Sequence, residues 1–313
     1  MSHPHTHDDH DHPDIPPPTL EEVGPGIYAY VQLDGSWGLN NSAFLVGRDG
    51  VTLVDTCFTE RRSRALIESI RSVASVPVRT LVNTHHHGDH THGNYLLPEA
   101  TIIGHELCRE EVIASGHIAS ALFQGVDWGD LEVAAPFVTF DDHLDVWVDD
   151  RRLALQFVGP AHTTNDIVGW LPEERMLVAG DLVFNGGTPF VVMGSVSGAI
   201  AAVHRLKALG ATTIIPGHGP VCGPEALDEQ EGYLRFVQDV AQRAFDAGTS
   251  PLDAALAADL GRFAEWHDPE RLVGNLYRAF SELRGEPLGM PIDPQAYADM
   301  ITYNGGRPLR CLA

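Results

Sequence analysis

The chain has 313 residues, of which 43% are hydrophobic and 20% charged, a composition typical of globular proteins and not of disordered ones. Asp and Glu number 43 against 20 Lys and Arg, and the resulting formal charge of −23 repels phosphate backbones. We therefore expect no nucleic-acid partner.

The sequence indicates neither membrane insertion nor export. We find no apolar run long enough to span a bilayer, and the first residues lack the apolar segment of a signal peptide. The four cysteines form no Cys-x-x-Cys pair, the spacing typical of a zinc knuckle. We expect a cytoplasmic protein without a membrane partner.

Residues 1–18 carry five histidines among Asp and Pro and end in three prolines. A tract of this composition cannot form a packed core, so we expect it to be disordered. It could bind zinc or nickel loosely and help to load a metal site, or it could be an inert extension. The residues themselves leave both possibilities open.

The chain from Gly26 reads as strands separated by Gly and Asp. We expect strands over 27–33, 43–46 and 51–54. The loop over 34–41 places Trp37 between glycines, in a position that favours mobility. Trp37 is therefore either a lid over a substrate or a side chain that packs against its own hairpin.

Residues 59–73 alternate apolar and charged side chains at helical spacing, with Thr59 as the expected N-cap. The short apolar run over 78–82 that follows is typical of a buried strand.

The pattern His-x-His-x-Asp-His stands directly after that strand. In an extended segment alternate side chains point the same way, so His85 and His87 can face one point. A turn at Gly88 would bring Asp89 and His90 to a second point close by. Imidazoles with a carboxylate suit zinc, and two adjacent clusters suit a pair of ions.

Further elements follow the motif. We expect a short helix from His92 that Pro98 ends, a strand over 101–104 and a helix from about Glu106. Residues 116–130 are expected to form an irregular insertion that walls a pocket. Three further strands are predicted over 138–140, 144–148 and 153–158.

Three more candidate ligands each follow a predicted strand. His162 comes shortly after the strand over 153–158, Asp181 ends a strand that begins at 176, and His218 ends one that begins at 213. Together with His85, they place candidate ligands at the carboxyl ends of four strands. Open sheets flanked by helices bind ligands at this edge.

The remainder is predicted to be mainly helical. We expect a helix over 197–209 capped by Ser197 or Gly198, then helices over 225–247, 251–260 and 269–283, and an irregular segment over 287–313. The predicted organisation is a tail over 1–18, a main domain over 19–222 and a helical extension over 223–313.

His86 and His92 fall outside the ligand pattern, and we place them in an outer shell or in solvent. We expect no functional role for His105, His117, His143, His204 and His267.

The ligand pattern over residues 20–222 resembles that of the metallo-β-lactamase superfamily. The resemblance implies an α/β fold, a four-layer αβ/βα sandwich, here with a C-terminal helical extension. It implies two Zn²⁺ ions per chain, that Asp55 orients a metal ligand and that the loop with Trp37 contacts substrate. The apolar segment that begins at Phe184 is a further candidate for substrate contact. The implied ligands of one zinc are His85, His87 and His162, those of the other are Asp89, His90 and His218, and Asp181 bridges both.

The resemblance also implies the chemistry. A bridging hydroxide would attack a carbonyl carbon, and Asp89 would orient the nucleophilic water or accept its proton. An Asp at position 181, where the commonest β-lactamases have Cys, resembles glyoxalase II-type thioesterases, lactonases and related dizinc hydrolases. We expect a small-molecule ester, thioester, lactone or amide as substrate, with a neutral or hydrophobic acyl part. The alternatives are an iron persulfide dioxygenase with a single metal ion, and a β-lactamase-like activity.

Overall fold

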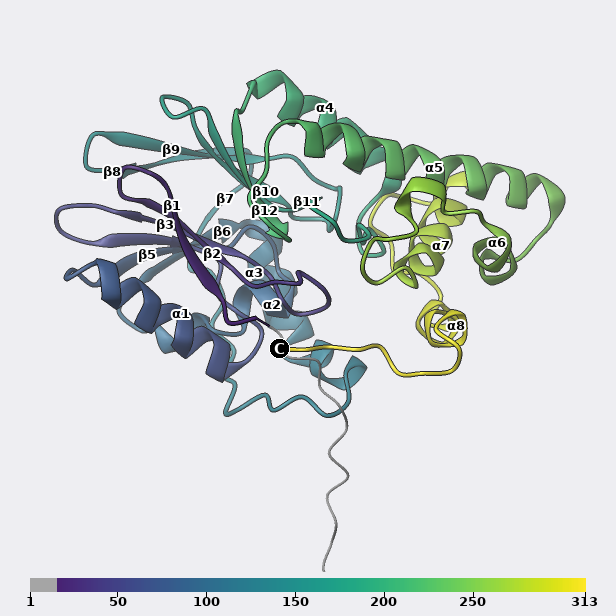
Figure 1. Ribbon diagram of the computed structural model, residues 1–313, viewed down its shortest axis with the longest axis horizontal. Coiled ribbons are helices and arrows are strands. Elements are labelled where there is room, and N and C mark those ends of the chain that lie inside the picture. Colours follow the sequence, from purple (N-terminus) through teal and green to yellow (C-terminus); the bar gives the residue numbers. More distant parts are fainter. Residues whose placement is uncertain (1–15) are drawn as a thin grey trace, which may run out of the picture.

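A computed structural model describes residues 16–313, apart from the side chain of residue 119. Within this range two mixed sheets lie face to face between outer layers of helices, which is the predicted four-layer sandwich (Figure 1). The first sheet has the strand order β1-β2-β3-β4-β5-β6-β7 and the second β12-β11-β10-β9-β8. The strands of the first are β1 Thr19–Gly24, β2 Ile27–Val31, β3 Ser42–Val46, β4 Val51–Val54, β5 Val78–Val82, β6 Thr101–His105 and β7 Val138–Phe140. Those of the second are β8 His143–Val148, β9 Arg151–Phe157, β10 Ile167–Leu171, β11 Met176–Phe184 and β12 Thr213–His218.

The alternation of side chains along each strand builds the layers. In β3, Ala43 and Leu45 belong to the core between the two sheets, while Phe44 faces the helix outside the first sheet. In β11, Val178 lies between the sheets and Leu177 faces the helices outside the second sheet. Strands buried on both faces in this way read as continuous apolar runs in the sequence.

Helix α1 (Glu60–Val73) covers the first sheet with Leu66 and Ile70, and Thr59 caps it by accepting a hydrogen bond from the backbone N–H of Arg62. Helix α4 (Val196–Leu209) covers the second sheet. Its N-cap is Ser195, whose hydroxyl accepts from the N–H of Gly198, so the predicted cap at Ser197 or Gly198 was wrong by two or three residues.

The segment after Pro224 is helical, as predicted. It contains α5 (Glu225–Ala247), α6 (Pro251–Ala257), the 3-10 helix η3 (Gly261–Phe263) and α7 (Arg271–Leu283). These helices share one hydrophobic core with α4 and the second sheet. The expectation of an irregular 287–313 was wrong in part, because α8 (Gln295–Tyr303) forms there. Pro294 precedes its first turn, a position where proline costs no hydrogen bond.

Beyond α8 the chain returns to the first sheet. Leu309 is buried, and the guanidinium of Arg62 on α1 donates to the carbonyl of Leu312 at 2.6 Å. In Figure 1 the C-terminus accordingly lies below α2 and α3 and not among the yellow helices. This return brings residues of the helical extension to the edge of the sheets where the candidate ligands lie.

Several local expectations differ from the structure. Strands β1 and β10 were not predicted, and the helix expected from His92 is instead a short helix α2 (Gly88–Thr91) followed by the 3-10 helix η1 (Asn94–Leu96). Helix α3 (Glu106–Ser115) begins where predicted, and the insertion after it contains the 3-10 helix η2 (Ile118–Leu122).

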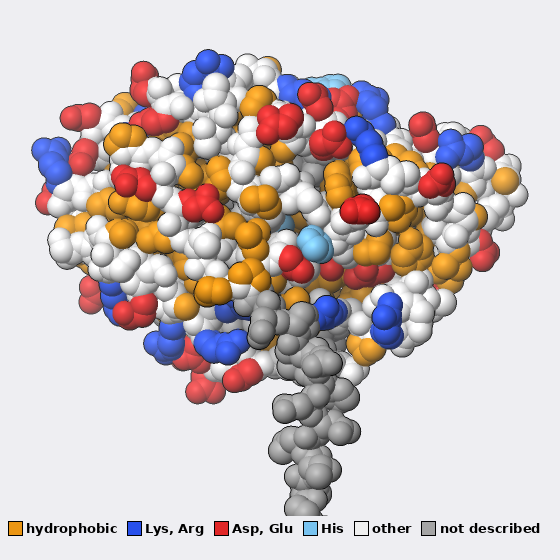
Figure 2. All heavy atoms as spheres, viewed as in Figure 1, with side chains coloured by type: hydrophobic (Ala, Val, Ile, Leu, Met, Phe, Trp, Pro, Cys, Tyr) orange, Lys and Arg blue, Asp and Glu red, His pale blue; other side chains and the backbone are white. Residues whose placement is uncertain are grey.

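Acidic side chains are distributed over the face in Figure 2 with basic and hydrophobic ones between them, without merging into a single patch. Among the described residues no helix combines the length and the hydropathy needed to cross a bilayer. The histidine-rich tract was predicted to be disordered and open to a role in metal loading. Almost all of it, residues 1–15, lies outside the described residues.

Candidate metal centre

The candidate ligands lie at one edge shared by both sheets. Strand β9 is antiparallel to β10 and β10 to β11, so β9 and β11 run the same way, and β12 is parallel to β11. His162 after β9 and His218 at the end of β12 therefore emerge together. His85 follows β5 in the first sheet, so the ligands come from two sheets. The sequence had instead predicted that they meet at the edge of a single sheet.

Asp181 does not end its strand. It lies inside β11, where Gly180 adopts a φ of 51° and the pairing with β12 shifts register. This irregularity lets a polar side chain leave a strand that is otherwise apolar, and β11 then continues to Phe184. A sequence pattern shows the carboxylate after an apolar run but not that the strand resumes behind it.

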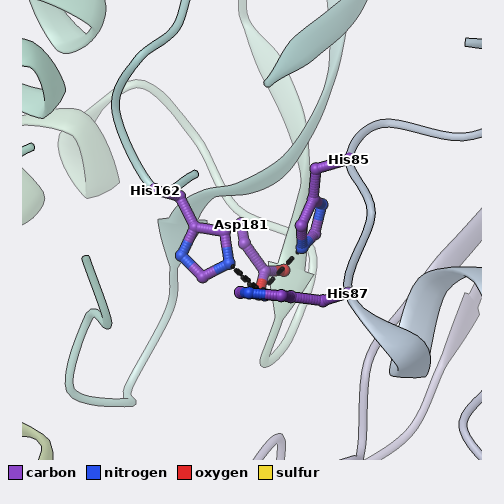
Figure 3. A group of neighbouring side chains, drawn as sticks. All are labelled: His85, His87, His162 and Asp181. Atoms are coloured by element: carbon purple, nitrogen blue, oxygen red, sulfur yellow. Dashed lines mark hydrogen bonds and ion pairs between the residues drawn. The ribbon is translucent and has the colours of Figure 1, made fainter. Parts of the chain in front are cut away.

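Three imidazoles and one carboxylate converge at the first cluster (Figure 3). Nε2 of His162 lies 2.8 Å from Nδ1 of His87 and 3.3 Å from Oδ2 of Asp181, and Nε2 of His85 lies 3.9 Å from the same oxygen. The four candidate ligand atoms are all within 4.8 Å of one another. This is the donor set that zinc prefers in proteins.

The second cluster shares Asp181 with the first. Its members are Asp89, His90, Asp181 and His218, again with ligand atoms within 4.8 Å of one another. Oδ1 of Asp181 is 3.0 Å from Nε2 of His90, and Oδ2 is 3.4 Å from Nε2 of His218. Oδ2 of Asp89 is 3.3 Å from the same His218 nitrogen. All seven residues predicted as ligands therefore meet, with Asp181 in both groups.

Buried acceptors orient two of these rings. Nδ1 of His90 donates to Oδ2 of Asp55 at 2.8 Å, and Oγ1 of Thr84 donates to the same oxygen at 2.6 Å. Because that hydroxyl gives its proton to Asp55, it accepts from Nδ1 of His85, 3.0 Å away. With Nδ1 held in this way, Nε2 of both rings is directed at the cluster. The Asp55 contact is the one expected from the sequence, whereas Thr84 was not predicted.

Two further rings are held by backbone carbonyls. Nδ1 of His162 donates to the carbonyl of Phe190, and Nδ1 of His218 donates to that of Gly35 at 3.0 Å. These carbonyls belong to loops that are far apart in the sequence, so the ring orientations depend on tertiary contacts. No sequence pattern marks a carbonyl as a partner, since every residue has one.

Unpartnered atoms support the fit to a cation. Nε2 of His85, Nε2 of His90 and Oδ1 of Asp181 are buried and make no hydrogen bond of acceptable geometry with any described residue. Polar atoms buried without a partner cost free energy, and a metal ion at each cluster would satisfy these, since His85 belongs to the first cluster, His90 to the second and Asp181 to both. The residues present therefore fit two metal ions.

The histidines of the site differ in the direction in which their surroundings shift the pKa. Burial lowers the pKa of His85 well below its usual range, and the neighbouring His90 adds to this effect. Burial also opposes charge on His90 and His218, but the nearby carboxylates, Asp181 foremost, together outweigh it. They raise the pKa of His90 well above its usual range and that of His218 to about 9. The same imidazoles hold the pKa of Asp181 well below normal against its burial. The carboxylates thus attract positive charge at the second cluster most strongly.

A cavity of about 370 Å³ opens over the clusters. Its lining includes Trp37 and Phe184, the two residues predicted to contact substrate, and part of the 116–130 insertion. The Trp37 ring contacts Phe123 and Phe190, both far from its own hairpin in the sequence. It also stacks on the guanidinium of Arg271 at 3.9 Å, and its Nε1 donates to Glu270 at 2.8 Å. Phe184 stacks on the His218 ring with centroids 5.0 Å apart.

His86 and His92 are closer to the site than expected. Both are buried and line the cavity, with Nδ1 of His86 against the Asn165 side chain and Nδ1 of His92 donating to the carbonyl of Phe58 at 3.1 Å. The sequence placed them in an outer shell or in solvent because they fall outside the ligand pattern. The helix α2 that begins at Gly88 turns His92 back towards the cavity.

The chain was compared with known proteins. The model of the metallo-beta-lactamase superfamily matches residues 35–218. A linear primary-alkylsulfatase of a Pseudomonas species is 23% identical, and the alignment covers 83% of this chain but only 60% of that protein. The 2,4-dinitroanisole O-demethylase subunit alpha of a Nocardioides species is 28% identical over 72% of this chain and 67% of its own length. A solved metallo-beta-lactamase from Pontibacter korlensis has a TM-score of 0.59 at 19% identity, covering 70% of this chain and 99% of that one.

Proposed function

Because the chain belongs to the metallo-beta-lactamase superfamily, we propose that it is a hydrolase that binds two zinc ions and cleaves an ester, thioester, lactone or amide of a small molecule. The observation that carries this proposal is the pair of clusters that share Asp181 at the floor of a cavity. The relative called an alkylsulfatase is by its name a hydrolase of sulfate esters, which supports hydrolysis as the general class of reaction.

We assign the ligands by cluster. His85, His87 and His162 would hold one ion, and Asp89, His90 and His218 the other, with Asp181 between them. When bound, such a pair of ions supplies Lewis-acid polarisation of a carbonyl and a water of lowered pKa.

The chain's own residues position the reaction. Asp55, Thr84 and the carbonyls of Gly35 and Phe190 hold four imidazoles in one tautomer. Asp89 lines the cavity and turns Oδ2 to His218. We propose that its Oδ1 orients the attacking water and accepts its proton.

Metal quantification on the purified protein followed by an activity panel tests the proposal. We expect two zinc ions per chain, and hydrolysis of at least one of an ester, a thioester, a lactone and an amide. Chelation should abolish turnover, and re-addition of zinc should restore it.

The alternatives give different results in the same experiment. One iron per chain with oxygen uptake on glutathione persulfide would establish the dioxygenase instead. Turnover confined to β-lactams would establish a β-lactamase. A protein that holds no metal after reconstitution would refute all three. The cytoplasmic location expected from the sequence remains part of the proposal.

A further inference from the structure

The cavity over the metal centre is built by parts of the chain that are far apart in sequence. Its floor includes Asp89 and Asp181, and its walls come from the loop with Trp37, the 116–123 segment and the extension after residue 224. Tyr297 and Leu309 represent that extension in the lining. The helical extension therefore completes the space in which a substrate must lie.

The walls are aromatic and already packed on one another. The ring of Trp37 lies 5.0 Å from Phe190, edge to face, and 5.6 Å from Phe123. Phe123 in turn meets Phe58 edge to face at 5.8 Å. Rings in mutual contact of this kind hold their positions without a ligand, and a preformed apolar cavity binds hydrocarbon surface at little ordering cost.

Among the described residues that line the cavity, Arg271 is the one Arg or Lys. Its side chain is already engaged, since Nη2 pairs with Oδ2 of Asp268 at 2.9 Å and Nη1 donates to the carbonyl of Thr188 at 2.9 Å. The ring of Trp37 covers the guanidinium, and the residue is only 1% exposed. An anionic group on a substrate, away from the metals, would thus be buried against aromatic rings with no free counter-ion, which is strongly unfavourable.

We propose that the substrate is an ester whose acyl part is an uncharged hydrocarbon, and that this part fills the cavity between the Trp37 loop, the 116–123 segment and the helical extension. This inference rests on the proposed function. It excludes substrates that carry an anionic group on the acyl chain.

Matched substrates test the charge preference directly. p-Nitrophenyl hexanoate and the mono-p-nitrophenyl ester of adipic acid have chains of the same length, and only the second ends in a carboxylate. We expect kcat/KM to rise about fourfold per methylene from the acetate to the hexanoate ester, and to be at least tenfold lower for the adipate ester than for the hexanoate. A flat series, or an adipate ester hydrolysed as well as the hexanoate, would overturn the proposal.

A cation placed at the rim tests where the acyl chain lies. Ile118 lines the cavity and is 71% exposed, so Ile118→Arg should fold. Ile113 on α3 is 55% exposed and is not part of the lining, which makes Ile113→Arg a matched control. We expect Ile118→Arg to raise the adipate-to-hexanoate ratio of kcat/KM at least threefold, and Ile113→Arg to leave it unchanged. An unchanged ratio in both variants would show that the chain does not lie in this cavity.

Binding of ketones separates this inference from the proposed function, because ketones are not hydrolysed. 2-Heptanone and 6-oxoheptanoate share one carbon chain and differ by a terminal carboxylate. We expect the dissociation constant of 2-heptanone, measured from the change in tryptophan fluorescence, to be at least tenfold lower than that of 6-oxoheptanoate. The fluorescence change should be absent in Trp37→Phe. This result in a zinc-loaded protein that cleaves no ester would support the preference of the cavity for an uncharged chain and would refute the proposed hydrolase. Ester hydrolysis without a preference for 2-heptanone over 6-oxoheptanoate would support the hydrolase and refute the preference for an uncharged chain.

Discussion

Replacing Asp55 with Asn tests whether this buried carboxylate sets the orientation of a metal-binding histidine. Oδ2 of Asp55 accepts hydrogen bonds from His90 at 2.8 Å and from the Thr84 hydroxyl at 2.6 Å, and Oδ1 accepts from the backbone N–H of Thr84 at 2.8 Å. Asparagine has the same shape and can keep the Oδ1 bond. Its amide nitrogen, however, would face two donors and can accept from neither.

The expected cost follows from those contacts. Two charge-assisted hydrogen bonds are lost, each worth about 1.5–3 kcal/mol, so the metal-free protein should lose at most about 3–6 kcal/mol of unfolding free energy. The metal site is also affected, because the ring of His90 loses its fixed tautomer and the Thr84 hydroxyl, no longer donating to Asp55, is free to donate to His85. Removal of a partner that orients a ligand lowers metal affinity by about 10- to 100-fold.

Competition with a chelator measures the zinc affinity of each variant, and thermal unfolding of the metal-free protein monitors the fold. Asp299→Asn is the matched control, since Asp299 is a buried carboxylate on α8 that accepts from the Tyr277 hydroxyl at 2.6 Å and from Gln295 at 2.9 Å. We expect this control to bind zinc like the wild type. If Asp55→Asn also bound two zinc ions with unchanged affinity, the orienting role of Asp55 would be refuted.

Three other substitutions test separate parts of the structure. Asp181→Ala should lower metal occupancy and abolish turnover with a native circular dichroism spectrum, and full activity would remove the shared-ligand role. In Gly217→Ala the new Cβ would overlap Oδ1 of Asp181 and lie 2.6 Å from the backbone carbon of Gly180; we expect reduced metal content and a loss of about 1–3 kcal/mol of stability, and normal metal content would contradict this crowding. The hydrogen bond from Lys207 lowers the pKa of Glu231 from its ordinary value near 4.5 to about 2, so Glu231 contributes stability above pH 4.5 that is lost as the pH falls towards 2. Urea titrations of Glu231→Gln and the wild type should differ by about 1 kcal/mol or less at pH 7 and converge near pH 2, and a difference independent of pH would exclude the charge as its source.

The ligand positions could be read from the sequence because local chemistry specifies them. A histidine or carboxylate directly after a short apolar run marks a polar group at the end of a buried strand, and four such places occur in the order of one family. The helix α1 with its Thr59 cap and the strands β4, β5 and β7 were predicted to within a residue for the same reason, since period and capping are local properties.

Other elements were missed where a local signal had a different meaning in context. Prolines and glycines around α8 predicted an irregular segment, but Pro294 starts the helix and Ala296 and Met300 bury their side chains under it. Strand β10 was not predicted, because its five residues have no helical or alternating period of their own. Its position comes from pairing with β9 and β11.

The sequence by itself determined which residues are available to bind metal and which strands deliver them, because spacing and residue type are properties of short segments. Only the tertiary structure decided that the Thr84 hydroxyl links His85 to Asp55, that the carbonyls of Gly35 and Phe190 hold two of the rings, and that Arg271 is covered by Trp37. Each of these contacts joins segments that are far apart along the chain. Their geometry is set by how two sheets and a helical extension pack together, which no short stretch of sequence contains.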